Sequence, residues 1–173
     1  HQGSVKTGVA VQAIKPREQQ WAVSLNNAEI AEELFDGLVI ATPALTAANL
    51  LAGTAAEGQI PAFDYEAITT CYLQYPKGTR LSAPFYALTD DATQEQWGQF
   101  VFDRGQLDAK QDGLLAVVVS ISTAATELGQ EALAAAIARQ LAQALQMSQL
   151  AQASWSKVIT EKRATFSCTP GLQ

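Results

Sequence analysis

Two short charged groups are the residues of this sequence best suited to acid–base chemistry. Asp103-Arg104 lies in the stretch GQFVFDRGQL, and Glu161-Lys162-Arg163 lies in VITEKRATF. An acidic side chain within reach of a reacting atom can act as a general acid in catalysis. Charged groups of this kind more often form solvated turns or local salt bridges, so both interpretations stay open at this point.

Other catalytic residue types are scarce. His1 is the only histidine, so the sequence cannot supply a His-based triad, a facial metal triad or a histidine general base. Cys71 and Cys168 lie far apart in the sequence and without a CxxC pattern, which argues against a zinc site. Unpaired thiols in a reducing cytoplasm are the simpler interpretation, and a disulfide is the alternative.

The stretch FDGLVIATPALTAANLL predicts a strand, a sharp turn and a helix. The unbroken apolar run 38–41 predicts a strand over 36–41 that is buried on both faces, as in a parallel or mixed sheet. Pro43 has no amide hydrogen and suits the first turn of a helix, so the helix should cover 44–51.

Period-2 patterns predict the other strands. Before the central stretch, we expect a strand that ends near Ile14, a polar turn over 15–20, a strand over 21–25 and a turn at Asn26-Asn27. The glycine-rich segment 51–61 is the expected domain boundary. After it, strands are expected over 67–75, 84–88, 98–104, 114–121 and 154–161, with 114–121 at the centre of its sheet. Residues 163–166 should continue in an extended conformation.

One long helix is expected over 130–147. Leu133, Ile137, Leu141 and Leu145 recur every four residues and should pack on the sheet, while Gln140 falls among the polar residues of the other side.

Composition limits the classes of partner. Hydrophobic residues make up 48% of the 173 residues and charged residues 16%, which fits a globular chain and excludes disorder. The net charge of −6, without a Lys/Arg cluster, argues against nucleic acid. No apolar run is long enough for a membrane span, and the abrupt opening without a start methionine predicts an excised piece of a cytoplasmic protein.

The amino-acid sequences of several stretches resemble those of a flavoenzyme family. TGVAVQAI, WAVSL and FDGLVIATPA are similar, in this order and spacing, to the middle of FAD-dependent amine oxidases, phytoene desaturases and their relatives. There, a V-x-x-I strand, a β-meander and a D-x-V-v-x-A-t-P strand complete the FAD-binding domain. GQFVFDRGQL and VITEKRATFSCTPGL most resemble the squalene-associated FAD-dependent desaturases, or hydroxysqualene dehydroxylases, of bacterial hopanoid synthesis. The resemblance covers nearly the whole chain.

The resemblance implies FAD as the cofactor of the intact protein. It implies backbone contact from Val11 to the adenine, and it places Ala41, Thr42 and Pro43 near the dinucleotide. An ordinary strand and turn would look the same. The sequence holds no G-x-G-x-x-G turn for the FAD pyrophosphate, so we expect no appreciable FAD binding by this chain alone.

The resemblance also implies an apolar isoprenoid substrate. Five residues are the candidates to line a tunnel for it, because a C30 hydrocarbon offers little but apolar surface; core packing is the alternative for each. If an acid assists departure of the substrate hydroxyl, Asp103 is favoured over Glu161. The five tunnel candidates are Tyr72, Gln74, Trp97, Phe100 and Phe102.

The predicted fold class is α+β. Residues 1–58 should be part of an FAD-binding domain, and 59–173 a substrate-binding domain with a mixed, mainly antiparallel sheet and one packed long helix. The intact protein is expected to be an oxidoreductase that is cytoplasmic or peripheral to the inner membrane. The present chain is expected not to be catalytic by itself and to dimerise through uncovered apolar residues. A stand-alone apolar-ligand module and another flavoenzyme of the amine oxidase family are the alternatives.

Overall fold

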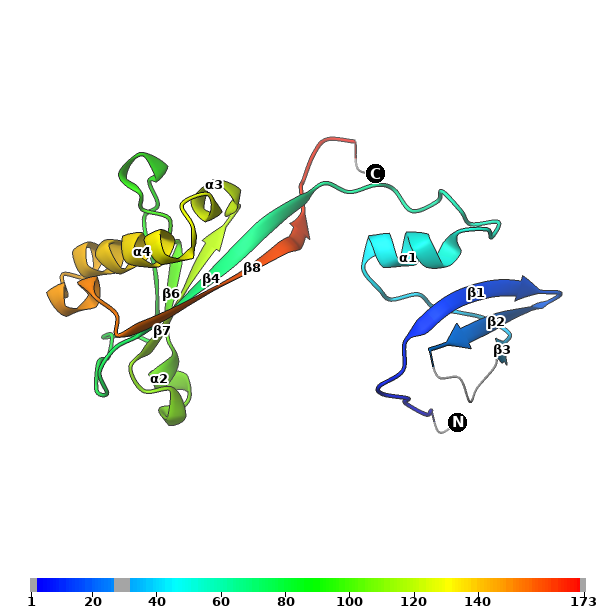
Figure 1. The fold of residues 1–173 in the computed structure, drawn as a ribbon, viewed down its shortest axis with the longest axis horizontal. Coiled ribbons are helices and arrows are strands. Elements are labelled where there is room, and N and C mark those ends of the chain that lie inside the picture. The colour runs from blue at the N-terminus through cyan, green and yellow to red at the C-terminus, as the bar shows by residue number, and fades with distance from the viewer. Residues whose placement is uncertain (1–2, 27–31, 172–173) are drawn as a thin grey trace. The chain divides into compact units, whose positions relative to one another are not determined.

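The computed structural model describes residues 3–26 and 32–171, so His1 and Asn27, the second residue of a predicted turn, lie outside the described residues. The chain forms two compact units (Figure 1). Unit 1 comprises residues 1–63 with 170–173, and unit 2 comprises residues 64–169. All pairings between the described strands are antiparallel, so the expectation of a mixed sheet was wrong in that detail, while the α+β class is confirmed.

Unit 1 is a three-stranded sheet with one helix. Its strands β1 (Val11–Arg17), β2 (Gln20–Leu25) and β3 (Glu33–Phe35) follow one another in the order β1-β2-β3. The predicted turn over 15–20 is confirmed in place but is shorter, because β1 runs through Pro16 and the chain reverses at Glu18, which has a positive φ of 52°. An edge strand tolerates proline because the missing N–H need not join the ladder.

The predicted strand over 36–41 was also wrong. No described strand pairs with these residues, Val39 is 95% exposed, and the preceding β3 is antiparallel to β2. An apolar run becomes a doubly buried strand only where neighbouring strands can pair with it. The helix that follows is confirmed, since α1 covers Ala44–Leu51 directly after Pro43.

Unit 2 is a five-stranded antiparallel sheet of strand order β5-β6-β7-β4-β8. The predicted central position of the 114–121 strand is confirmed, because β7 has two strands on either side. Short helices and 3₁₀ turns connect the strands. The strands are β4 (Tyr65–Gln74), β5 (Phe85–Ala87), β6 (Phe100–Asp103), β7 (Leu114–Ser120) and β8 (Trp155–Phe166). The connecting elements are η1 (Ala92–Gln94), α2 (Arg104–Leu107), η2 (Ala109–Gln111), α3 (Thr123–Thr126) and η3 (Ser148–Ala151).

The helix α4 (Gln130–Ala144) packs on one face of this sheet (Figure 1). Its Leu133, Ile137 and Leu141 are fully buried, as their spacing predicts. They meet the inward side chains of β4, β6, β7 and β8, among which Val117 and Cys71 have no exposed surface. The core of unit 2 therefore lies between α4 and the sheet, and the opposite face carries no described helix of comparable length.

The position of Gln140 differs from the one predicted from the helical period. It is 3% exposed and lies against the loop that enters β6, whereas the period placed it on the polar side. Its Nε2 donates to the carbonyl oxygens of Thr89 and Gly98, both at 2.9 Å, and its Oε1 accepts from the Gly98 N–H at 2.7 Å. Gln140 thus connects α4 to a loop more than forty residues earlier in the chain.

Candidate functional site

Strand register places four of the five predicted tunnel residues on one face of the unit 2 sheet. Directly opposed residues of antiparallel strands point to the same side. Phe102 opposes Ala116, Ala116 opposes Tyr72, and Phe100 opposes Val118 in the neighbouring row. Gln74 lies two residues beyond Tyr72 on the same strand. This is the face turned away from α4, and we name it the open face.

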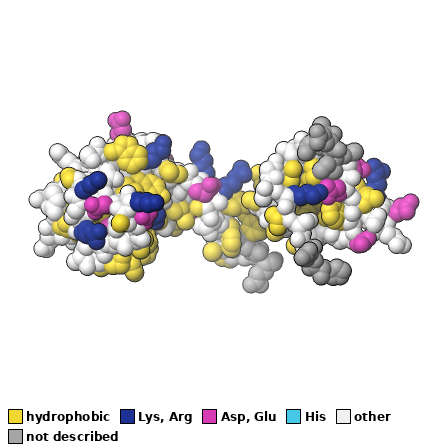
Figure 2. All heavy atoms as spheres, turned by 90° about the horizontal axis from the view of Figure 1, so that it is seen from below, with side chains coloured by type: hydrophobic (Ala, Val, Ile, Leu, Met, Phe, Trp, Pro, Cys, Tyr) yellow, Lys and Arg dark blue, Asp and Glu magenta, His cyan; other side chains and the backbone are white. Residues whose placement is uncertain are grey.

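The open face is apolar and largely uncovered. Phe85, Phe100, Trp155 and Ile159 are 56%, 43%, 54% and 52% exposed, and the rings of Phe85 and Phe102 stack with centroids 5.9 Å apart. Figure 2 views the molecule from this side and shows hydrophobic side chains at the surface of unit 2 beside a group of charged ones. The open face includes Thr70, Tyr72, Gln74, Phe85, Phe100, Phe102, Ala116, Val118, Trp155, Lys157 and Ile159.

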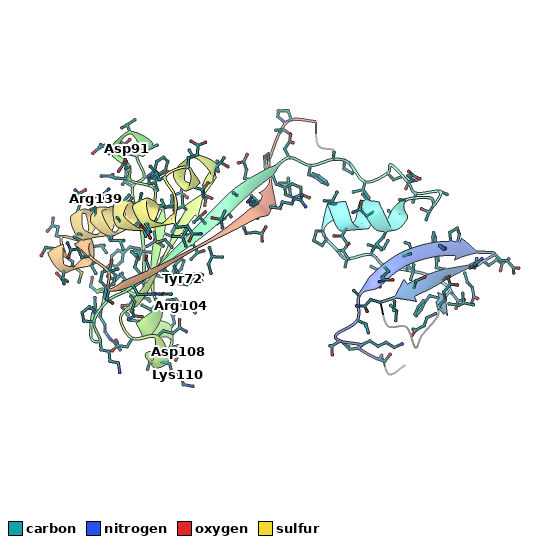
Figure 3. The ribbon with its side chains drawn as sticks, in the orientation of Figure 1. Tyr72, Asp91, Arg104, Asp108, Lys110 and Arg139 are labelled. Atoms are coloured by element: carbon teal, nitrogen blue, oxygen red, sulfur yellow. The ribbon has the colours of Figure 1, made fainter. Side chains whose placement is uncertain are left out.

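The segment of α2 and η2 borders this face with charged groups. Figure 3 shows Tyr72 on the side of the sheet away from α4, with Arg104, Asp108 and Lys110 on that side as well. The backbone N–H of Lys110 and the side chain of Gln111 hydrogen-bond to Asp108 and lower the pKa of its carboxyl. Asp108 is therefore ionised near neutrality, and its carboxylate oxygens accept hydrogen bonds from residues of its own loop.

Tyr72 and Gln74 differ in what they can still bind. Gln74 Nε2 donates to the carbonyl oxygens of Tyr75 and Asp112, at 2.8 and 3.1 Å, so this amide joins the ends of β4 and β7. Tyr72 lies between Ala116 and Lys157 in its row, and its hydroxyl has no partner among the hydrogen bonds of the described residues. Of the two, Tyr72 has the free polar group.

Trp97 lies elsewhere. It is partly buried and packs against the core beneath α4, which is the core interpretation left open for each tunnel candidate. Its Nε1 is buried without a hydrogen-bond partner in the described part of the chain. Trp97 is therefore not part of the open face.

Asp103 also lies away from the open face. It shares the inward side of β6 with Val101 and is completely buried. Its Oδ2 accepts hydrogen bonds from the Leu81 N–H at 2.9 Å and from Gln106 Nε2 at 2.8 Å, while Oδ1 has no described partner. This geometry argues against contact between Asp103 and a substrate on the open face, and it gives the carboxylate a structural role in holding the loop before β5.

Glu161, the weaker acid candidate, opposes Ile68 on β8 and is exposed. Its Oε1 accepts a hydrogen bond from the Arg163 N–H at 2.9 Å. This contact lies where the register between β4 and β8 shifts. The carboxylate therefore accepts a hydrogen bond from a backbone N–H at a local irregularity of the strand.

The predicted cofactor-binding residues all belong to unit 1. Val11 opens β1 and is 45% exposed, and Ile14 behind it is buried. Ala41, Thr42 and Pro43 are exposed in the extended segment before α1. Among the hydrogen bonds of the described residues, none uses the backbone groups of 38–42. These residues could offer backbone groups to FAD, but the described chain has no phosphate-binding turn, so they fit only part of the cofactor.

A pocket of about 460 Å³ lies on the other side of the sheet, between the start of α4 and the strands β4 and β8. Leu133, Val158, Thr160 and Lys162 are among the residues that line it. Thr160 continues into a row of hydroxyls, because Thr69 Oγ1 is 2.8 Å from both Thr160 Oγ1 and Ser122 Oγ. The described residues contain no cluster of three or more metal-ligating side chains and no helix that could cross a bilayer.

One relevant residue was missed from the sequence, and one expected residue is placed by the structure. Lys157 follows Trp155 and precedes Ile159 on the open face, and the alternation of β8 was the signal that could have placed it there. Cys71 belongs to the core, where burial raises the pKa of its thiol to about 12. Both cysteines are free, with Cys168 exposed, so Cys71 is the inert thiol of the pair.

Comparison with known proteins identifies the fold. No protein-family model matches the sequence, and a search of curated proteins finds no match. The crystal structure of a putative protoporphyrinogen oxidase from Exiguobacterium sp. 255-15 is similar over 94% of this chain, with a TM-score of 0.65 and 11% sequence identity. This chain covers 36% of that protein's chain. The low identity makes this a likeness of fold, shared with about a third of the neighbour.

Proposed function

We propose that this chain is the substrate-binding part of an FAD-dependent oxidoreductase, with the open face of unit 2 as one wall of the substrate cavity. The observation that carries the proposal is the set of aromatic and aliphatic side chains left uncovered on β5, β6 and β8, on one face of the five-stranded sheet. A sheet packed by a helix on one face and apolar on the other needs a second apolar surface or ligand. The structural neighbour is named as an oxidase, the reaction class implied by the sequence resemblance.

The specific substrate that we propose is hydroxysqualene, reduced to squalene in hopanoid synthesis. The support is the similarity of GQFVFDRGQL and VITEKRATFSCTPGL to the hydroxysqualene dehydroxylases, together with the lack of charge on the β5, β6 and β7 part of the open face. Reduced FAD would supply the hydride in the intact protein, and the hydroxyl of the substrate would leave as water. The residues of this chain would bind the hydrocarbon, orient it and exclude water.

The first test is made on the intact protein and on this chain, purified under identical conditions. A flavin absorbance spectrum in the intact protein and, once the flavin has been reduced chemically, conversion of hydroxysqualene to squalene are the expected results, with no flavin bound by the chain alone. An intact protein without flavin would refute the oxidoreductase proposal and favour an apolar-ligand module. A flavoprotein that binds flavin but leaves hydroxysqualene unchanged would refute only the substrate.

The second test probes the open face itself. Phe100→Ala should raise KM roughly fivefold, because covering half of a phenylalanine is worth about 1 kcal/mol. The matched control is Leu45→Ala on α1, since Leu45 is 48% exposed and Phe100 is 43% exposed. Equal KM values for the two variants would show that the open face does not meet the substrate.

A further inference from the structure

We infer that Tyr72 and Lys157 form the polar end of the open face and bind a hydrogen-bond-accepting oxygen of the substrate. The inference rests on the proposed function and deepens it. The hydrocarbon part of the substrate would lie across β7, β6 and β5, and its oxygen would lie over β4 and β8. Tyr72 and Lys157 would then determine both the direction in which the substrate binds and the preference for an oxygen-bearing isoprenoid over a plain hydrocarbon.

Strand register brings the two side chains together. Tyr72 and Lys157 are directly opposed in the pairing of β4 with β8, so their Cβ atoms are about 5 Å apart and both point to the open face. The phenol hydroxyl and the ammonium are both hydrogen-bond donors. An oxygen atom placed above this pair can accept from both at once.

The charge of Lys157 is not neutralised within the described structure. None of the ion pairs of the described residues involves Lys157. Glu161 lies on the same face, but four residues along an extended strand separate the two by about 13 Å. The remaining neighbours of Lys157 on its own strand are Trp155 and Ile159, both apolar on this face.

The composition of the row gives the direction. Along the row that contains Lys157, the residues are Phe85, Phe102, Ala116, Tyr72 and Lys157 in spatial order, so polarity rises from β5 to β8. A hydrocarbon laid over the whole row would remove the ammonium and the hydroxyl from water without replacing their hydrogen bonds, which is unfavourable. A molecule whose oxygen lies over Tyr72 and Lys157 replaces those bonds, and an apolar arm of it then lies over β7, β6 and β5.

The test measures binding to the intact protein by calorimetry with three probes of equal chain length. Farnesene has no oxygen, farnesol has a hydroxyl, and farnesoic acid has a carboxylate. We expect farnesol to bind more tightly than farnesene. Lys157→Met keeps the aliphatic stem and should weaken the oxygenated probes about tenfold, as expected for loss of a hydrogen bond to a charged group, while farnesene binding is unchanged or improved.

Two further variants separate the donors from general effects. Tyr72→Phe should weaken farnesol a few-fold and leave farnesene unchanged. Lys162→Met is the matched control, because Lys162 is also on β8 but lines the pocket on the α4 side, and it should change neither affinity. If farnesoic acid binds much more tightly than farnesol, the oxygen belongs to an anionic group; if the two are similar, it belongs to a neutral one, and both results support the inference.

Two results would count against the inference and are distinguishable. Equal affinities for farnesene and farnesol, unchanged in Lys157→Met, would overturn the polar end while leaving the open face as an apolar wall. Failure of all three probes to bind the wild-type protein would overturn the proposed function of the open face together with the inference.

Discussion

Replacing Gln140 with leucine should destabilise unit 2, although the helix period places this residue among solvent-facing ones. The substitution removes three hydrogen bonds, two of them to the N–H and C=O of Gly98, which is itself buried. Each buried backbone group left unsatisfied costs about 1–3 kcal/mol, and burial of the leucine offsets about 1.5–3 kcal/mol of the total. We expect a net loss of about 2 kcal/mol in the free energy of unfolding.

The assay is urea denaturation of the intact protein, followed by tryptophan fluorescence. With a slope of about 2 kcal/mol/M, the midpoint of the unit 2 transition should fall by about 1 M. Amide hydrogen exchange at Gly98 is a local measure, and its protection should decrease because the bond to Gln140 Oε1 is lost. The control is Gln143→Leu, one turn along on the exposed surface of α4, which should change stability by less than about 0.5 kcal/mol. A Gln140→Leu midpoint equal to that of the control would refute the reasoning.

Three further predictions concern Asp103 and the two cysteines. Asp103→Asn should keep turnover of the intact enzyme within about twofold, because Asp103 is buried away from the open face and an amide oxygen can accept the same two hydrogen bonds. A loss of turnover with unchanged stability would instead support the general-acid role. In native protein, a thiol reagent should modify Cys168 and spare Cys71 until the chain is unfolded. Burial raises the pKa of Cys71 from 9.0 to about 12, so its contribution to stability is complete below pH 9 and is lost as the pH rises from 9 towards 12, by about 1.4 kcal/mol per pH unit. Cys71→Ala should therefore show a flatter decline of unfolding free energy over that range, and parallel curves for the two proteins would contradict the assignment.

The sequence contained most of the local structure of unit 2. Alternation along β4 separates the buried Cys71 and Leu73 from the more exposed Thr70 and Tyr72, as the period-2 pattern predicts. The apolar, β-branched run of β7 predicts a strand at the centre of the sheet, and β7 is there. These predictions succeed because the hydrophobic pattern of a central strand or of an amphipathic helix lies within a short run of consecutive residues.

The prediction of a strand over 36–41, which depended on partner strands, failed, and the surroundings of Asp103 could not be predicted from the sequence. The run 38–41 has the composition of a buried strand but no strand to pair with in the described chain, so Val39 is almost fully exposed. Asp103 was selected for its charge and its place in a recognisable motif, whereas its environment is set by Leu81 and Gln106. A side chain's chemistry depends on what surrounds it, and the surroundings come from other parts of the chain.

The sequence by itself indicated most of the strands and the long helix of unit 2, and which residues of each strand share a side. The tertiary structure alone decided that α4 covers one side of the sheet, which leaves Tyr72, Phe100 and Phe102 together on the other, and that Lys157 stands beside Tyr72. The physical reason is the sequence separation between the residues that interact. Periodicity acts between residues a few positions apart, whereas strand register and helix docking join residues that are tens of positions apart, as in the pairing of Tyr72 with Lys157.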